Sequence, residues 1–523
     1  MSRALRIGAL IYGVTLLLSR LLGVIREGVI GRILGAGGEA DVYWVAFILP
    51  DFMNYLLAGG AIGLVLIPII QEALQRGGER AAEESVGVIG GALTLLVLLS
   101  TTTLWLTCPL FSEWIAPGFN SEQNAELIAL TRIILPAQIF HLAGGLLSAM
   151  LQARDQHVGP AIAPLIYTLS VIIGGLTLGP LIGARGFAWG VLAGSCLGPF
   201  AVNFYACRRA EISLSLSWPF GHPDLRRWFW RTLPVMLGLS IVVLDELIVK
   251  RSGTRFGDGV AAQLHYARAL LRVPMGVFGL ALGVAAFPTL SRLWAAGDQI
   301  EMGQTLCRAT GALLLLSCLG QAALWGAGAE AAGFIWGMDR FTVDQLGEIG
   351  SFTGGLALGL PAWSLQGLFA RAFYAQGLTW PPTLIGSAVC LCALPLYATL
   401  GETFGPIGLT YASSAAVSAY TLALLAALRW RLGREALRGL LKSISRALLI
   451  SLSTYLMVHF TGTLFPSWST PPSALPHWLW FLVRGGLTTG GGLFGLVVSA
   501  WILRAPELTW LSTKLRRVLA RKN

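Results

Sequence analysis

Two arginines, Arg20 and Arg26, stand in an otherwise apolar run near the start of the chain, and Asp41 follows after a glycine-rich turn. An arginine at the centre of a membrane-spanning helix costs about 2.5–3.5 kcal/mol to insert, so such residues usually face a wet cavity or a partner. A guanidinium group also binds phosphate oxygens bidentately and stays charged when partly desolvated. We interpret residues 19–68 as one wall of a basic cavity for an anionic ligand. Structural ion pairs with Glu27 or Asp41 are the alternative.

A second charged cluster lies in the middle of the chain. Arg268 and Arg272 are four residues apart, so on a helix they share a face, and their like charges repel unless an anion or a carboxylate lies opposite. We expect them to contribute to the same cavity, or else to pair with Asp245 and Glu246 of the preceding apolar run. Asp245 and Glu246 are also candidates for binding a coupling ion or a proton, with structural ion pairing as the alternative.

The elements that must position these residues are apolar helices. Only 12% of the 523 residues are charged and 55% are hydrophobic, whereas soluble proteins carry about 25% charged residues. Apolar runs long enough to cross about 30 Å of hydrocarbon recur along the whole chain, so we predict an all-α polytopic membrane protein. The net charge of +11 comes from basic residues at helix ends and in loops, as in membrane proteins, and we predict no binding to nucleic acid.

We predict about fourteen spans, with both termini in the cytoplasm because the basic residues gather in the segments on that side. The basic run Lys250–Arg255 is the exception, because it is predicted on the outer side. It is either a tolerated departure from the positive-inside pattern or a basic rim that binds an anionic ligand. The predicted spans are about 8–34, 41–73, 85–111, 123–152, 157–179, 185–208, 228–251, 260–293, 303–326, 346–376, 381–400, 405–429, 441–464 and 477–503.

An internal repeat supports this organisation. The segment Ala58–Gly77 aligns without a gap with Phe278–Gly297, which implies an offset of roughly 220 residues, or six spans. Parallel repeats of this kind are a transporter architecture with the substrate between two lobes. The predicted domains are residues 1–215 (N-terminal lobe), 216–432 (C-terminal lobe), 433–505 (two further helices) and 506–523 (basic tail). Hinge candidates, with close packing as the alternative, are Gly59, Gly60 and Pro361.

Several runs resemble one known family: SRLLGVIRE (19–27), GAGGEADVYWVAFILPDF (35–52) and LPAWSLQGLFARAFYAQG (360–377). The chain resembles the MurJ (MviN) family of lipid II flippases, in the MOP superfamily of exporters. The resemblance implies two six-helix lobes around a cationic cavity that opens alternately to each side of the bacterial inner membrane. It also implies an apolar groove on the last two helices for the polyprenyl tail. The implied cargo is undecaprenyl-diphosphate carrying the disaccharide-pentapeptide of peptidoglycan.

The resemblance assigns roles to individual residues. Arg20 and Arg26 match the family's cavity arginines of the first helix, and Asp41 matches its acidic residue at the start of the second. Where the family often has a third cavity arginine, this chain has Asn54. Arg268 stands one position away from the family's arginine in helix 8. The predicted substrate-binding set is therefore Arg20, Arg26, Asp41, Asn54, Arg268 and Arg272.

Three function classes remain to be weighed. A flippase for another polyprenyl-diphosphate-linked oligosaccharide, or a MATE-like drug exporter, is the alternative to the lipid II flippase. We predict no enzyme and no cofactor, because the short outer loops contain no catalytic or metal-ligand spacing. We expect a monomer among membrane lipids, with the cell-wall synthesis machinery as a candidate partner. We expect transport to be coupled to Na⁺, to H⁺ or to the membrane potential, and the sequence does not decide between them. Some family members have the Asp of a sodium site late in helix 7, and this chain has Val249 at that position.

Overall fold

The computed structural model describes residues 3–58, 65–213, 215–218, 221–237, 241–276, 280–337, 339–465 and 476–503. Helices and short connections make up these residues, and no β-strand occurs among them. This confirms the predicted all-α membrane fold. Within the described ranges, nine helical segments are long and apolar enough to cross a membrane. The total of fourteen spans stays a prediction.

The chain divides into two compact units. Unit 1 comprises Met1–Gly238 and Lys250–Ala262, and unit 2 comprises Leu239–Val249 and Gln263–Asn523. The helices of unit 1 are α1 (Arg3–Leu34), α2 (Gly38–Val45), α3 (Ile48–Ala58), α4 (Ile67–Ile115), α5 (Ser121–Ile134), α6 (Ala137–Gln152), α7 (Val158–Ile182), α8 (Ala184–Ser195), the π-helix η2 (Cys196–Val202), α9 (Asn203–Arg209), α10 (Pro223–Leu237) and the 3₁₀ turn η3 (Thr254–Phe256).

Unit 2 contains most of the second half of the chain. Its helices are α13 (Leu280–Ala295), α14 (Gln299–Trp336), α15 (Val343–Ala357), α16 (Leu360–Ala375), α17 (Trp380–Phe404), α18 (Pro406–Ala436), α19 (Leu440–Leu464) and α20 (His477–Ile502). The helices α11 (Ile241–Gly253) and α12 (Val260–Pro274) each begin in one unit and end in the other. The turn between α11 and α12 thus belongs to unit 1 although most of α12 belongs to unit 2.

Helix breaks fall at glycine and proline. Helix α4 joins the predicted spans 41–73 and 85–111 through a kink at Gly77 and Gly78, where Gly78 has a φ of 67°, a backbone conformation that glycine adopts without strain. Pro136 separates α5 from α6, as expected from its lack of a backbone N–H. The break at Pro136 explains why the predicted span 123–152 appears as two shorter helices, whereas the kink at Gly77 and Gly78 lies between two predicted spans.

The core of unit 1 gathers around α4. Ile69, Ile70 and Ile89 of this helix are fully buried in a cluster that includes Leu146 and Trp228 from α6 and α10. Helices α7 and α8 pack closely side by side, and an added Cβ on Gly175 would overlap the ring of Phe187. Small residues at helix contacts are the usual way in which membrane helices approach one another.

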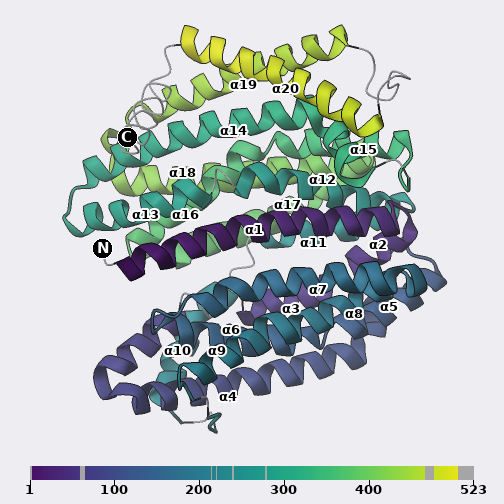
Figure 1. The fold of residues 1–523 in the computed structure, drawn as a ribbon. Coiled ribbons are helices and arrows are strands. Elements are labelled where there is room, and N and C mark those ends of the chain that lie inside the picture. Colours follow the sequence, from purple (N-terminus) through teal and green to yellow (C-terminus); the bar gives the residue numbers. More distant parts are fainter. Residues whose placement is uncertain are drawn as a thin grey trace. The chain divides into compact units, whose positions relative to one another are not determined.

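In unit 2, the last two helices pack against α14, as Figure 1 shows with α19 and α20 beside it. Arg484 of α20 forms a buried ion pair with Glu330 of α14. Because a buried charge is costly unless it is paired, this contact fixes α20 to α14 at one position.

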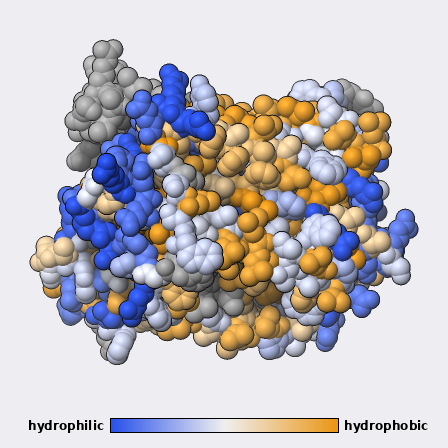
Figure 2. Space-filling view, turned by 90° about the horizontal axis from the view of Figure 1, so that it is seen from below, coloured by the Kyte–Doolittle hydropathy of each residue, from blue (hydrophilic) through white to orange (hydrophobic). Residues whose placement is uncertain are grey.

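The surface carries the signature of a membrane protein. Figure 2 shows hydrophobic residues gathered in the middle of one face and hydrophilic residues at its two ends. Large apolar side chains are exposed on several helices, including Leu99 and Leu106 of α4 and Ile173 and Leu176 of α7. In a water-soluble protein such patches would be unusual, whereas lipid tails cover them in a bilayer.

Candidate functional site

Helix α1 carries the two arginines that the sequence singles out. Arg20 is half-buried, and no side chain in the described part of the protein pairs with it. Arg26 donates to Glu27 Oε1 at 2.7 Å, and its side chain is 27% exposed. The Nε atom of Arg26 is nevertheless buried without an acceptor among the described residues. The ion pair with Glu27, the alternative to cargo binding, is therefore present on this helix, and so is an unused donor.

Asp41, at the start of α2, is a buried carboxylate with two backbone hydrogen bonds. It is 1% exposed, and its carboxylate accepts backbone hydrogen bonds from Gly259 and from Ala262, each at 2.6 Å. Gly259 directly precedes α12 and Ala262 lies in its first turn, where backbone N–H groups have no intrahelical acceptor. Asp41 thus stabilises the start of α12, a role that sequence spacing did not indicate. Cargo binding by Asp41 stays a prediction.

We call residues 250–262 the docked turn, because several further contacts hold it within unit 1. Gln123 Nε2 donates to Asp258 Oδ1 at 2.7 Å. Arg251 Nε donates to the Trp114 carbonyl oxygen at 2.7 Å, and its guanidinium lies 5.0 Å from the centre of the Trp114 ring. The basic run that departs from the expected charge asymmetry is therefore held by specific contacts.

Helix α3 presents Asn54, which replaces the family's third arginine. Its side chain is exposed, and none of the hydrogen bonds of the described residues involves it. One turn earlier, Asp51 lies 4.0 Å from the Lys250 Nζ atom of the docked turn. The structure thus leaves Asn54 accessible in unit 1, and its role in binding stays a prediction.

In unit 2, Arg268 lies in a buried polar network. Its guanidinium is 2.5 Å from Asp245 Oδ2, and Asp245 also accepts hydrogen bonds from the hydroxyl groups of Ser413, at 3.0 Å, and Tyr397. Arg268 further lies 5.8 Å from the centre of the Trp363 ring. The network ties α11, α12, α16, α17 and α18 together. The ion pair between Arg268 and Asp245, the alternative to a place in the cavity, is therefore present.

Arg272, one turn further along α12, is more accessible. It pairs with Glu246, but 47% of its side chain is exposed, compared with 7% for Arg268. His265 Nδ1 lies 3.9 Å from the same glutamate, on the same face of α12. Sequence reasoning missed His265, although its spacing of three residues from Arg268 would have placed it there.

Of the three hinge candidates, only Pro361 lies among the described residues. Gly59 and Gly60 lie outside the described residues. Pro361 is in the first turn of α16, just after the break that ends α15. At this break the Gly359 N–H donates to Ser414 Oγ at 3.1 Å, and an added Cβ on Gly359 would crowd Ser414. The site of the break is thus closely packed, and a hinge at Pro361 stays a prediction.

The four candidate arginines are divided equally between the two units. Arg20 and Arg26 lie in unit 1, and Arg268 and Arg272, with their carboxylate partners, lie in unit 2. Within the described ranges, no group of three or more His, Cys, Asp or Glu side chains is placed to hold a metal ion. These guanidinium groups are suited to binding phosphate oxygens through charge-assisted hydrogen bonds.

Comparisons with known proteins agree on one family. A family model described as lipid II flippase MurJ matches residues 30–473. A probable lipid II flippase MurJ of Rhizobium tropici is 27% identical over 398 residues, which cover 73% of this chain and 74% of that protein. The lipid II flippase MurJ of Burkholderia cenocepacia is 25% identical over 425 residues, 79% of this chain and 82% of that protein.

Solved structures show the same fold. A lipid II flippase MurJ in an inward closed conformation superposes with a TM-score of 0.77 at 20% identity, over 94% of this chain and 99% of that one. An inward-facing MATE family transporter of the MOP superfamily superposes with a TM-score of 0.67 at 13% identity, over 80% of this chain and 98% of that one. The likeness to the flippase structure extends over almost the whole of both chains.

Proposed function

The chain belongs to the MurJ family of lipid II flippases, and we propose that it moves lipid II from the inner to the outer leaflet of the bacterial cytoplasmic membrane. The observation that carries this proposal is the family match over residues 30–473, which includes nearly all described helices. We propose that the protein works by alternating access, with both termini in the cytoplasm. Peptidoglycan synthesis would then consume the exported precursor.

We propose that α1 binds the diphosphate of the cargo. A diphosphate has about two negative charges and several acceptor oxygens, and guanidinium groups recognise such groups bidentately. Arg20 has no partner within the described residues, and Arg26 has a buried Nε without an acceptor. Both arginines therefore offer donors that a bound diphosphate would satisfy.

In unit 2, Arg272 is the better candidate for cargo binding. The charge of Arg268 is balanced by Asp245 within a buried network, so using Arg268 for the cargo would leave Asp245 unpaired. Arg272 is partly exposed and bonded to a glutamate that is itself accessible. We propose that a diphosphate competes with Glu246 for Arg272. Glu246 is also the better candidate for binding a coupling ion, because both carboxylate oxygens of Asp245 already accept hydrogen bonds.

We propose that the docked turn participates in alternating access. Helices α11 and α12 connect unit 2 to this turn, which Asp41, Gln123 and Trp114 hold within unit 1. Contacts that hold the turn would stabilise one state of the transport cycle. Their loss would be required in another state.

Complementation of a bacterium depleted of its own lipid II flippase tests the proposal. The wild-type chain is expected to restore growth, whereas Arg20→Ala and Arg26→Ala should fail at normal protein levels. Arg32→Ala is the matched control, because Arg32 is exposed in the last turn of the same helix. No rescue by the wild-type chain, or full rescue by both variants, would refute the proposal.

The second candidate, a flippase for another polyprenyl-diphosphate-linked oligosaccharide, rests on Asn54, which stands where the family often has an arginine. Rescue of a strain lacking such an oligosaccharide flippase, without rescue of the lipid II strain, would favour it.

A further inference from the structure

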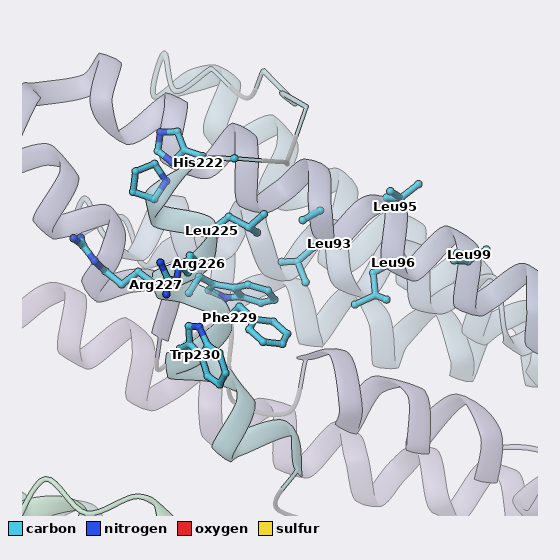
Figure 3. A pocket seen from close by; sticks show the side chains of 14 residues that line it. Leu93, Leu95, Leu96, Leu99, His222, Leu225, Arg226, Arg227, Phe229 and Trp230 are labelled. Atoms are coloured by element: carbon cyan, nitrogen blue, oxygen red, sulfur yellow. The ribbon is translucent and has the colours of Figure 1, made fainter.

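Unit 1 contains a cavity that the proposed transport does not use. Its volume is about 910 Å³, and it lies between α4 and the start of α10. Figure 3 shows the leucine side chains of α4 in a row towards one end, and His222, Arg226 and Arg227 at the other. Pockets of about 300–1,000 Å³ are large enough to bury most of a small ligand. The cavity therefore has an apolar part and a basic part.

The apolar part is made by α4 on a surface that lipid tails cover. Leu95, Leu96 and Leu99 line the cavity and are 49%, 40% and 64% exposed. Phe229 and Trp230 of α10 add exposed aromatic surface on the other side. Aromatic side chains of this kind gather at the membrane–water interface, which places α10 at the level of the lipid headgroups.

One arginine at the basic end is already neutralised. Arg227 lies 3.5 Å from Glu72 and 3.3 Å from Asp224. Burial would raise the pKa of the Asp224 carboxyl, but the hydrogen bond from Ser85 and the guanidinium groups of Arg76 and Arg227 leave that pKa below its ordinary value. Asp224 is therefore a carboxylate at neutral pH, and it balances the charge of Arg227.

His222 at this end accepts a hydrogen bond from the Asp224 N–H and lies 3.5 Å from Glu84. Arg226 and Trp228, in contrast, have unused donors. Arg226 is exposed, and no carboxylate of the described residues pairs with its side chain. Trp228 lines the cavity and is 4% exposed, and its indole Nε1 is buried without an acceptor in the described structure. A buried N–H without an acceptor costs about 1–3 kcal/mol, so a ligand oxygen at this position would be stabilising.

We propose that this cavity binds an anionic phospholipid of the phosphatidylglycerol class. The phosphate would lie against Arg226, the Trp228 indole would donate to a phosphate or ester oxygen, and an acyl chain would lie along Leu95, Leu96 and Leu99. Basic pockets beside membrane helices at the headgroup level recognise anionic lipids in this way. The site is separate from the arginines assigned to the cargo and does not depend on transport.

Native mass spectrometry of the purified full-length protein, titrated with phosphatidylglycerol or phosphatidylcholine, tests the proposal. We expect tighter binding of phosphatidylglycerol, and about fivefold weaker binding in Arg226→Ala, which corresponds to ~1 kcal/mol for one basic residue. Arg80→Ala is the matched control and should bind as the wild type does, because Arg80 is exposed, outside the cavity and without a partner in the described structure.

A second measurement locates the lipid. Phosphatidylglycerol with a photoreactive group on its acyl chain should label the peptide that contains residues 93–99, and Leu96→Trp should reduce that labelling by filling the cavity. Equal affinity for the two lipids, an unchanged affinity in Arg226→Ala, or labelling confined to other helices would overturn the proposal. Preferential labelling of this peptide by a polyprenyl probe would assign the cavity to the cargo tail instead and would equally overturn it.

Discussion

The contact between Asp41 and α12 allows a quantitative prediction. Asp41→Ala removes the acceptor of two buried backbone N–H groups, those of Gly259 and Ala262. An unsatisfied buried donor costs about 1–3 kcal/mol, so two of them destabilise the docked turn by about 2–6 kcal/mol. The lower bound corresponds to a roughly 30-fold larger population of the undocked turn, at 1.4 kcal/mol for each factor of ten.

Hydrogen–deuterium exchange of the amides in residues 254–262 measures this change directly. In Asp41→Ala these amides should exchange at least about 30-fold faster than in the wild type. Gly259→Ala tests the same contact from the other side, because Gly259 has a φ of 90° and an added Cβ would overlap the carbonyl oxygen of Ala36. It should accelerate exchange in the same peptide.

Asp298→Ala is the control of matched chemistry. Asp298 also accepts a backbone hydrogen bond, from Glu301 at 2.9 Å, but it caps its own helix α14 in unit 2. Its removal should cost about 1 kcal/mol locally and leave the docked turn unchanged. Exchange of the docked turn at the wild-type rate in Asp41→Ala would mean that the two hydrogen bonds do not hold the turn.

Two further predictions concern packing and pairing. Asp245→Ala leaves the buried Arg268 unpaired and should lower the free energy of unfolding in a detergent–denaturant titration by about 3–5 kcal/mol. The double variant with Arg268→Met should recover part of this loss. Arg272→Met removes one partner of a half-exposed ion pair and should change the free energy of unfolding by about 1 kcal/mol or less. A strictly additive double variant would contradict the pairing. Gly118→Ala should loosen the docked turn, because an added Cβ would overlap the backbone carbonyl of Thr254. In Gly37→Ala the added Cβ meets open space, and the turn should stay as in the wild type. Equal hydrogen–deuterium exchange of the docked turn in the two variants would contradict this packing.

The helical architecture could be predicted because its causes are local. Apolar runs specify helices, and Pro136 and Gly78 end or bend them through their own backbone constraints. The ion pair of Arg26 could also be anticipated, since Glu27 is its sequence neighbour. Each of these features depends on residues within a few positions of one another.

Contacts between distant segments could be predicted only in part. Arginines on one predicted helix and carboxylates on its neighbour suggested ion pairs, but not that Asp245 takes the buried arginine and Glu246 the exposed one, because this depends on how each helix is rotated. The role of Asp41 was missed for a similar reason. Its partners are backbone N–H groups more than two hundred positions away. Every residue except proline has such a group, so residue type does not indicate which of them an aspartate will bind.

We expect this chain to translocate lipid II by means of the arginines of α1. Purified protein in vesicles that carry fluorescent lipid II measures this directly, as the rate at which the lipid reaches the opposite leaflet. Translocation should be well above that of protein-free vesicles, should be lost in Arg20→Ala and in Arg26→Ala, and should be retained in Arg32→Ala. A rate equal to that of protein-free vesicles, or full activity without either arginine, would contradict this expectation.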